Sequence, residues 1–351
     1  MRKIIVMFSI CFLYLNMVFC FSSSAKTKII DKDMPEWVIN PSSKYPKNNY
    51  LSAVGQGINR DSAENKSIEE IVSIFGHKIV AQTETTQRMQ QAQAEGLVNL
   101  YKSEEINQKI TKSEEIDNVI GVDVCEYWFD SNEKTWYALS VIDIAKFSNI
   151  YTSMIVQNDN EINHLLKLEN IENPSLEAYS YINLAEEIAT LNEENIRRLT
   201  IVNPDKGSIL KAQCNSKTSV HAMLLAMANK IPISVIIQDD FNSRLYSEIS
   251  KIISFYGFKT TTEADGKYQI KGKFYNEESI TKDNQVVYCK YTFDFSLDDV
   301  EKNLSIIPYN YSGREGSSTF PDARSRAIKK IETNLSESFK VSFESYIKKL
   351  K

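Results

Sequence analysis

An α+β fold is expected for this chain: two small domains, each a mostly antiparallel sheet packed with helices, joined by a helical connector. Apolar and polar residues alternate in several runs of both halves, which is typical of half-buried strands. Apolar residues at three- and four-residue spacing follow some of these runs and indicate helices that cover a sheet face. The stretch 160–200 has the helical spacing and no strand pattern, so it separates the two halves.

The composition is that of a globular protein. A length of 351 residues is enough for two domains with real cores. Hydrophobic residues make up 42% and charged residues 25%, which excludes a mostly disordered chain, a collagen and a multi-span membrane protein. The net charge of −5 gives no electrostatic reason to expect nucleic acid as a partner.

Residues 1–25 have the order of a secretory signal. Arg2 and Lys3 form a basic start, an almost unbroken apolar run follows, and the segment ends in small residues up to Ala25. Signal peptidases require small side chains just before the cut. We therefore expect export, with cleavage between Ala25 and Lys26.

Two other fates of this segment stay open. The apolar run passes through Cys20, whose lipidation is the second interpretation, although Phe19 stands where a lipidation site prefers a small residue. An uncleaved membrane anchor is the third, and the run of 18 residues at 4–21, which Ser9 and Asn16 interrupt, is at the lower limit for crossing a bilayer.

The first domain is placed at residues 26–150. Its helix begins near Asp61, with Glu64 three residues later as in a capping box. Its expected elements are a strand at 50–55, a helix at 61–75, a strand from 77 that fades into a polar, mobile loop at 85–94, and strands at 119–129 and 136–144 around a turn at 130–134.

A helical connector and linker are placed at residues 151–218. Apolar residues keep the helical spacing through 160–200. Pro204, Gly207 and their polar neighbours favour an irregular linker at 201–218.

The second domain is placed at residues 219–351 and ends in a long helix. Its clearest strand is 287–297, where apolar and polar residues alternate without a break. The expected elements are a strand at 231–237, a helix at 242–256, strands at 268–274, 287–297 and 304–311, and a helix at 321–350.

The first half resembles a known family in the order and spacing of its motifs. These are Pro35-Glu36-Trp37-Val38, the segment YLSAVGQG at 50–57, the helix at 63–75, and the hairpin segments YWFD at 127–130 and WYAL at 136–139. Over about residues 35–150 they resemble the twenty-kilodalton bacterial outer-membrane lipoprotein family, whose fold is also known at the N-terminus of a flagellar T-ring assembly protein. The resemblance implies a small α+β domain of the cell envelope without known catalysis. The second half is similar only loosely to α/β domains of envelope-assembly proteins.

No pattern in the chain predicts a catalytic, cofactor or metal site. None of the three histidines has another His or Cys at helical spacing. Gly55-x-Gly57 lacks the third glycine of a dinucleotide site and is expected to form a tight turn. Without the leader, three cysteines remain: Cys125, Cys214 and Cys289. They form one disulfide and a free thiol, or they are three small apolar side chains, and the sequence leaves this open.

One segment is the first choice for a recognition loop. Tyr309, Tyr311 and Arg314 lie in a run that passes from aromatic residues to glycines and contains one cation. The competing interpretation is an ordinary loop at the end of a strand.

The leading hypothesis is an exported, non-enzymatic cell-envelope protein of the periplasm or outer membrane. It would act by contact with envelope proteins or outer-membrane components in a structural or assembly role. One alternative is a ligand-binding protein or hydrolase for cell-wall or lipid ligands, with acidic residues, His221 or Arg314 in an inter-domain cleft. The other, from the resemblance, is an envelope component of motility. The partner and the oligomeric state stay open.

Overall fold

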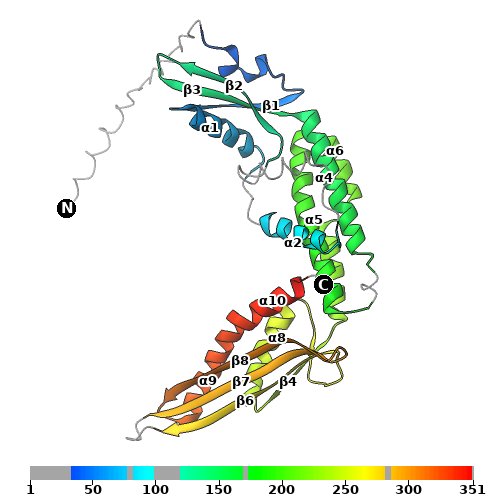
Figure 1. Cartoon of the computed structure of the whole chain (residues 1–351), viewed down its shortest axis with the longest axis vertical. Helices are drawn as coiled ribbons and strands as arrows, with labels where there is room; N and C mark the ends of the chain where they lie inside the picture. Colours follow the sequence, from blue (N-terminus) through cyan, green and yellow to red (C-terminus); the bar gives the residue numbers. More distant parts are fainter. Residues whose placement is uncertain (1–32, 77–81, 99–118, 169–172, 281–285, 350–351) are drawn as a thin grey trace, which may run out of the picture.

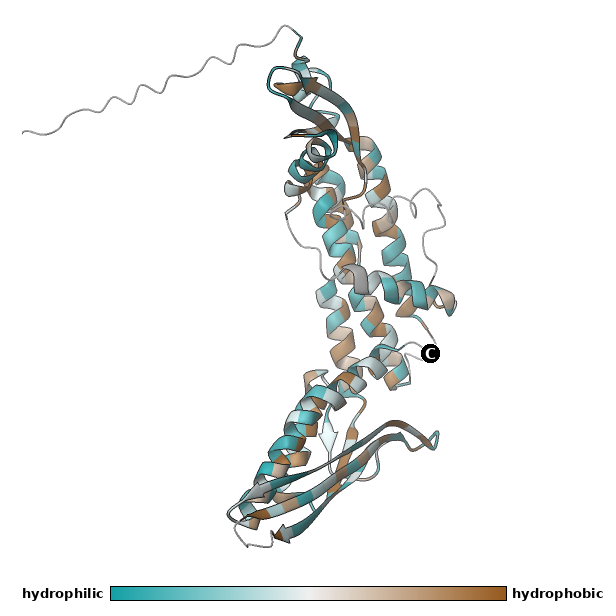
Figure 2. Ribbon diagram, turned by 60° about the vertical axis from the view of Figure 1, so that its left-hand side comes forward, coloured by the Kyte–Doolittle hydropathy of each residue, from teal (hydrophilic) through white to brown (hydrophobic). Residues whose placement is uncertain are grey.

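The computed structural model describes residues 33–76, 82–98, 119–168, 173–280 and 286–349. A small sheet lies at one end of the long axis, a group of helices in the middle and a larger sheet at the other end (Figure 1). Hydrophobic and hydrophilic residues alternate along the helices and strands (Figure 2). The α+β class with two helix-packed sheets is confirmed. The predicted cleavage site at Ala25 and Lys26 and the predicted lipidation site at Cys20 lie outside the described residues.

The first sheet has three antiparallel strands in the order β1-β3-β2. The predicted hairpin is present, because Asp130 Oδ1 accepts hydrogen bonds from the backbone N–H groups of Asn132 and Glu133 at 2.8 and 3.0 Å. Helix α1 packs on one face, and Trp37 packs with Tyr137 on the other. The bounds are β1 Tyr50–Gly57, α1 Arg60–Ser73, β2 Val122–Asp130 and β3 Thr135–Asp143, after short 3₁₀ turns at Glu36–Val38 and Pro41–Ser43.

Helix α1 begins one residue earlier than expected and has a different cap. Asn59, not Asp61, accepts a hydrogen bond from the N–H of Ser62 at 2.8 Å, and the Ser62 hydroxyl accepts one from the N–H of Asn59. An asparagine before the expected start therefore satisfies the free amides of the first turn.

Gly55 was expected in a tight turn, but in the structure it serves the packing of a helix against a strand. It lies inside β1, and a Cβ built there would be 2.1 Å from the Ser67 nitrogen and 2.3 Å from the Ala63 oxygen, both in the α1 backbone. Its missing side chain lets α1 approach the strand closely.

The middle of the molecule is helical throughout its described part, and the linker predicted at 201–218 is wrong. Asn203 caps a new helix by accepting from the N–H of Lys206 at 3.2 Å, and Pro204 occupies the first helical position, where no N–H is needed. Ser216 caps the next helix in the same way. The bounds are α4 Ile144–Leu165, α5 Leu176–Val202, α6 Pro204–Gln213 and α7 Lys217–Asn229.

The mobile loop predicted at 85–94 is also wrong, because these residues belong to helix α2, Gln82–Ala94. The start of the strand expected from residue 77 lies outside the described residues. Met89 and Ala92, three residues apart, are buried against the larger core, so a stripe of only two apolar positions holds a mostly polar helix.

The second sheet has the strand order β5-β4-β6-β7-β8. β4 is parallel to β5 and β6, and the three long strands β6, β7 and β8 are antiparallel. The final helix is interrupted by a π-helical turn at Leu335–Phe339. The bounds are β4 Ile233–Gln238, α8 Arg244–Phe255, β5 Thr260–Thr261, β6 Tyr268–Ile280, β7 Val287–Asp299, β8 Leu304–Ser317, α9 Phe320–Asn334 and α10 Lys340–Lys348.

Helix α5 contributes to both large cores. Leu184 and Ile188 in its first half are buried in the core of the second sheet, whereas Ile196 and Leu199 in its second half are buried with α1 and α4. The domain boundaries predicted at residues 150 and 218 fall within α4 and α7. The division into separate domains stays a prediction.

Arg88 connects three helices that are distant in sequence. Its guanidinium pairs with Glu187 of α5 at 2.6 Å and donates to the Asn183 amide oxygen at 3.0 Å. It also donates to the carbonyl of Lys348 at 2.7 Å, at the last turn of α10. These bonds satisfy a helix-end carbonyl and fix α2 between the connector and the C-terminal helix.

We predict that Gly55→Ala destabilises the protein by about 2 kcal/mol, because the added methyl group collides with the α1 backbone, which cannot rotate away. Urea unfolding measures the change, with Ser52→Ala in the same strand as control. Equal midpoints for Gly55→Ala and the parent would contradict the close approach of α1.

We predict that Arg88→Ala lowers the free energy of unfolding by about 2 kcal/mol. The substitution leaves the Glu187 carboxylate without its cation, and one oxygen of that carboxylate is already buried without a hydrogen bond. α2 should also become sensitive to limited proteolysis. The matched control is Lys66→Ala, an exposed ion pair whose loss should change neither measurement. Unchanged protection of α2 in Arg88→Ala would show that this contact does not hold the helix.

Candidate functional site

A groove lies in the second sheet where β4 ends and β6 continues. β4 pairs with β6 only from Tyr268 to Lys273. Beyond that point Phe274–Ile280 pairs with β7 on one side, and no strand of the described ranges covers its other side. The shortness of β4 therefore leaves the second half of β6 as a sheet edge.

The groove has a volume of about 870 Å³ and opens to solvent. Its wall is formed by β6 and β7, by the turn after β4 and by one residue of α9. The lining residues are Asp239, Asp240, Phe241, Lys273, Phe274, Tyr275, Asn276, Glu277, Lys290, Tyr291, Thr292 and Arg324.

The turn after β4 has an unusual backbone. Asp239, Asn242 and Ser243 all have φ between 54° and 59°, in the left-handed region that favours glycine. Asp240 holds this turn in place, because its carboxylate accepts from the N–H groups of Leu245 and Tyr246 at 3.1 and 2.8 Å. The strain is offset by a charged cap on the first turn of α8.

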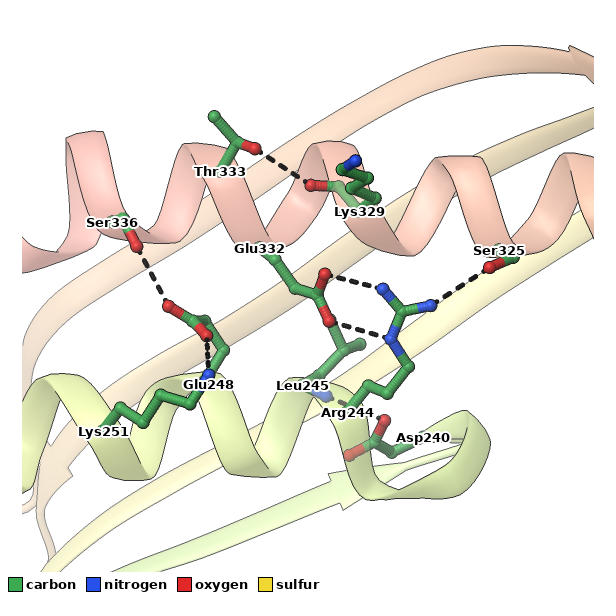
Figure 3. A network of polar contacts seen from close by, with 10 residues as sticks. All are labelled: Asp240, Arg244, Leu245, Glu248, Lys251, Ser325, Lys329, Glu332, Thr333 and Ser336. Atoms are coloured by element: carbon green, nitrogen blue, oxygen red, sulfur yellow. Dashed lines mark hydrogen bonds and ion pairs between the residues drawn. The ribbon is translucent and has the colours of Figure 1, made fainter. Parts of the chain in front are cut away.

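Polar contacts between α8 and α9 fix the two helices that flank the groove (Figure 3). Arg244 forms a bidentate pair with Glu332 at 2.8 and 2.6 Å and donates to the Ser325 hydroxyl at 3.2 Å. Glu248 of α8 accepts from the Ser336 hydroxyl at 3.0 Å. Arg244 follows the strained turn directly, and its partner Glu332 lies in the same helix as Arg324. The Arg244–Glu332 pair therefore fixes the position of Arg324 relative to Asp240.

Arg324 is the cation of the groove with the most restricted side chain. Its guanidinium carbon lies 4.0 Å from the centre of the Phe241 ring and 5.7 Å from that of Phe320. Its Nε is buried without a hydrogen-bond partner, and no carboxylate of the described residues forms an ion pair with it. The aromatic rings hold the charge in place while leaving its hydrogen-bonding capacity unused.

The carboxylates of the groove differ in the hydrogen bonds and ion pairs that they form within the protein. Asp240 caps α8, and Asp239 lies 3.5 Å from the Lys273 ammonium. Glu277 lies opposite Lys290 in the strand register, and Lys290 lies opposite Arg314 of β8. Two cations directly opposite each other on one sheet face repel, so this row favours an added negative charge.

The three residues predicted as a recognition loop lie in strand β8, not in a loop. Tyr309 is a core residue: its ring stacks on Phe295 at 4.6 Å and its hydroxyl donates to Asn334 at 2.7 Å. Tyr311 is half-buried beside Tyr291. Arg314 is exposed, with its guanidinium carbon 3.6 Å from the centre of the Tyr288 ring. Of the three, Arg314 is therefore the one exposed to a partner.

His221 and Arg314, the residues suggested for an inter-domain cleft, lie apart in the fold. His221 is exposed on α7 with Nδ1 3.0 Å from a Glu186 oxygen of α5, whereas Arg314 lies on β8. Within the described ranges, no group of three or more His, Cys, Asp or Glu side chains could hold a metal ion. No helix of these ranges is both long and apolar enough to cross a bilayer.

All three cysteines of the described chain are free thiols. Cys289 is buried in β7, as expected of a small apolar side chain. Cys125 is exposed instead, because it is the extra residue of a bulge where the β2 register shifts between Val124 and Glu126. Burial, with the nearby Asp159 carboxylate, raises the pKa of Cys214 to about 11.

The comparisons with known proteins give coarse similarities only. No protein-family model and no curated protein matches the sequence. A secreted protein, HP1454, from Helicobacter pylori is 10% identical with a TM-score of 0.38, over 83% of this chain and 96% of that one.

Two lipoproteins match smaller parts of the chain. A minor lipoprotein from Acinetobacter baumannii is 10% identical with a TM-score of 0.25, over 31% of this chain and 90% of that one. Uncharacterized lipoprotein B from Nitrosomonas europaea is 12% identical with a TM-score of 0.24, over 33% and 88%. The structural neighbours thus include a secreted protein and lipoproteins, and the chain is assigned to no family.

We predict that Cys214 of the folded protein reacts with iodoacetamide at pH 8 about a hundred times more slowly than a free cysteine. A pKa near 11 leaves very little thiolate at this pH, and the rate should rise about tenfold per pH unit until the pH reaches that value. Peptide mass spectrometry measures the labelling, with the urea-unfolded chain as control. A mass about 2 Da lower than that of three free thiols would reveal a disulfide and contradict the structure.

Proposed function

We propose that this chain is an exported, non-enzymatic protein of the bacterial cell envelope that works by binding other envelope proteins. The observation that carries the binding role is the groove beside the uncovered half of β6, with the unpaired Arg324 in its wall. Export is supported by the leader at residues 1–25, and a location in the periplasm or at the outer membrane follows if the leader is cleaved or Cys20 is lipidated.

The shape of the molecule supports a role as a connecting protein. The two sheets lie at opposite ends of the long axis, with α4 and α5 between them (Figure 1). Both sheets have edge strands, β1 and β2 in the first and β5 and β8 in the second. An elongated chain with surfaces at both ends can contact two partners at once, which suits a structural or assembly role.

The alternative of a hydrolase in an inter-domain cleft has less support. His221 lies on α7 beside Glu186 whereas Arg314 lies on β8, and the groove described above lies within the second sheet. Its Asp239 and Asp240 are engaged with Lys273 and with the α8 backbone, so neither carboxylate is free to act as a general acid or base.

Purification of the tagged full-length protein from crosslinked envelopes tests the proposal. We expect the intact mass of a chain that begins at Lys26, and recovery of the protein in complexes with identified envelope proteins. An acylated chain beginning at Cys20 would preserve the function and change the anchoring. A chain that retains Met1 in the cytoplasm, or a free monomer without partners in the envelope fraction, would contradict the proposal, as would turnover of a substrate by the purified protein.

A further inference from the structure

The second half of β6 is a sheet edge long enough to bind another strand. The seven residues from Phe274 to Ile280 extend about 23 Å. Along a strand, alternate residues direct both their N–H and C=O groups to the same side, so about half of these residues present backbone groups to the open side. Tyr275–Glu278 are all exposed, so the described part of the molecule leaves this edge accessible.

We propose that this edge binds an extended segment of a partner protein as an added strand, and that Arg324 pairs with a carboxylate that this segment carries on the face covered by α9. The proposal depends on the interaction function above and names its site and the chemistry of its partner. The main-chain bonds would supply affinity, and the groove would supply specificity through alternate side chains.

The two sides of the edge differ in what they offer an added strand. Phe274 and Asn276 point to the face that α9 covers, because Phe274 lies opposite the buried Phe293 in the register. Tyr275 and Glu277 point to the other face, where Glu277 lies opposite Lys290. An added strand places successive side chains on these two faces in turn. A side chain on the first face therefore lies on the same side as Arg324.

Arg324 explains why the segment carries a carboxylate. Its side chain is held between Phe241 and Phe320, and its buried Nε has no partner. A guanidinium prefers a planar, two-point contact with a carboxylate, and here the aromatic contacts fix the side chain before binding. On the other face Glu277 already lies opposite Lys290, so the partner's carboxylate is expected on the face of Arg324.

A second copy of this chain is a poor occupant of the same edge. Only Phe274–Ile280 is available, so a symmetric antiparallel pair of two copies would be centred on Glu277. Glu277 would then lie directly opposite its own counterpart on the same face. Like charges at directly opposite positions destabilise a strand pair. The charge pattern therefore favours a different chain.

The test uses the full-length protein with a photo-crosslinking phenylalanine analogue in place of Tyr275, illuminated in the producing cells. Tyr275 is 52% exposed and lines the groove. Mass spectrometry of the adduct then identifies the crosslinked segment. We expect one segment of another envelope protein, with an Asp or Glu within about three residues of the crosslink. A segment without an acidic residue, or a segment of this chain itself, would overturn the proposal.

A pair of variants on α9 separates the role of Arg324 from a general effect of charge. Arg324→Gln should reduce the adduct about tenfold, the loss expected of one charge-assisted hydrogen-bonded contact. Arg326→Gln removes the same charge two residues away, from an exposed side chain that donates to the Gly316 carbonyl at 2.8 Å. It should leave the adduct unchanged. Equal yields from both variants and the parent would exclude Arg324 as the recognition residue.

Hydrogen exchange tests the added strand without any substitution. A synthetic peptide with the sequence of the crosslinked segment should slow amide exchange at residues 274–280 at least tenfold and leave the exchange of β8 unchanged. No protection of residues 274–280 at saturating peptide would refute strand addition, even if Arg324→Gln fails to fold.

A second crosslinking position distinguishes failure of this inference from failure of the proposed function. Phe129 is 42% exposed on β2 of the first sheet, far from the groove. Adducts with envelope proteins at Phe129 and none at Tyr275 would overturn the strand-addition site and leave the interaction function standing. No adduct at either position, together with a free monomer in the envelope fraction, would contradict both.

Discussion

The hydrogen bond between Asn158 and Asn192 lies where helix α5 passes from one hydrophobic core to the other. Both side chains are buried; the Asn158 amide donates to Asn192 at 3.3 Å, and Asn192 donates to the Ile155 carbonyl at 3.1 Å. A buried amide pair contributes little net stability, but it penalises any register in which the two do not meet. Sliding α5 along α4 would break this pair and displace both apolar segments of α5 together. The relative position of the two sheets therefore depends on this contact.

The groove depends on the same helix through a chain of contacts. The hydroxyl of Tyr268, the first residue of β6, accepts from the N–H of Leu176 at the start of α5 at 3.1 Å. β6 then runs away from the connector, and its uncovered half lies at the distal end of the sheet (Figure 1). β4 stops early because the chain turns through Asp239 into α8, a turn held by Asp240 and by the Arg244–Glu332 pair. The same residues that end β4 thus create the edge and place Arg324 beside it.

The spacing of apolar residues predicted the helices and strands that have a regular pattern. It missed those that a few specific contacts hold in place. The strand at 287–297 has six alternating apolar positions and was predicted within two residues of its observed end. The buried apolar residues in the described part of helix α2 are Met89 and Ala92, and the helix is tied by Arg88, whose three acceptors come from α5 and α10. The short helix α6 begins with Pro204 after the capping Asn203, a start signal that was interpreted as a linker. The sequence did not predict the groove, because no local pattern shows that β6 extends beyond the end of its neighbour β4. Two features of the sequence could have indicated the groove. One is a strand that continues past Phe274, and the other is the presence of Phe320 close to Arg324 in the chain.

The two sheets differ in how much of their surface the rest of the chain uses. The first has α1 on one face and the Trp37 cluster on the other, so its large aromatic side chains mostly serve its own stability. In the second, α8 and α9 cover one face, while the other presents Tyr288, Lys290 and Arg314 in adjacent positions of two strands. Charges on an exposed face and edge normally keep a sheet from pairing with unspecified strands. Here Glu277 disfavours a strand that places a carboxylate opposite it, whereas Arg324 on the other face favours one that places a carboxylate there, so the charges of the edge select the position of a partner's acidic residue.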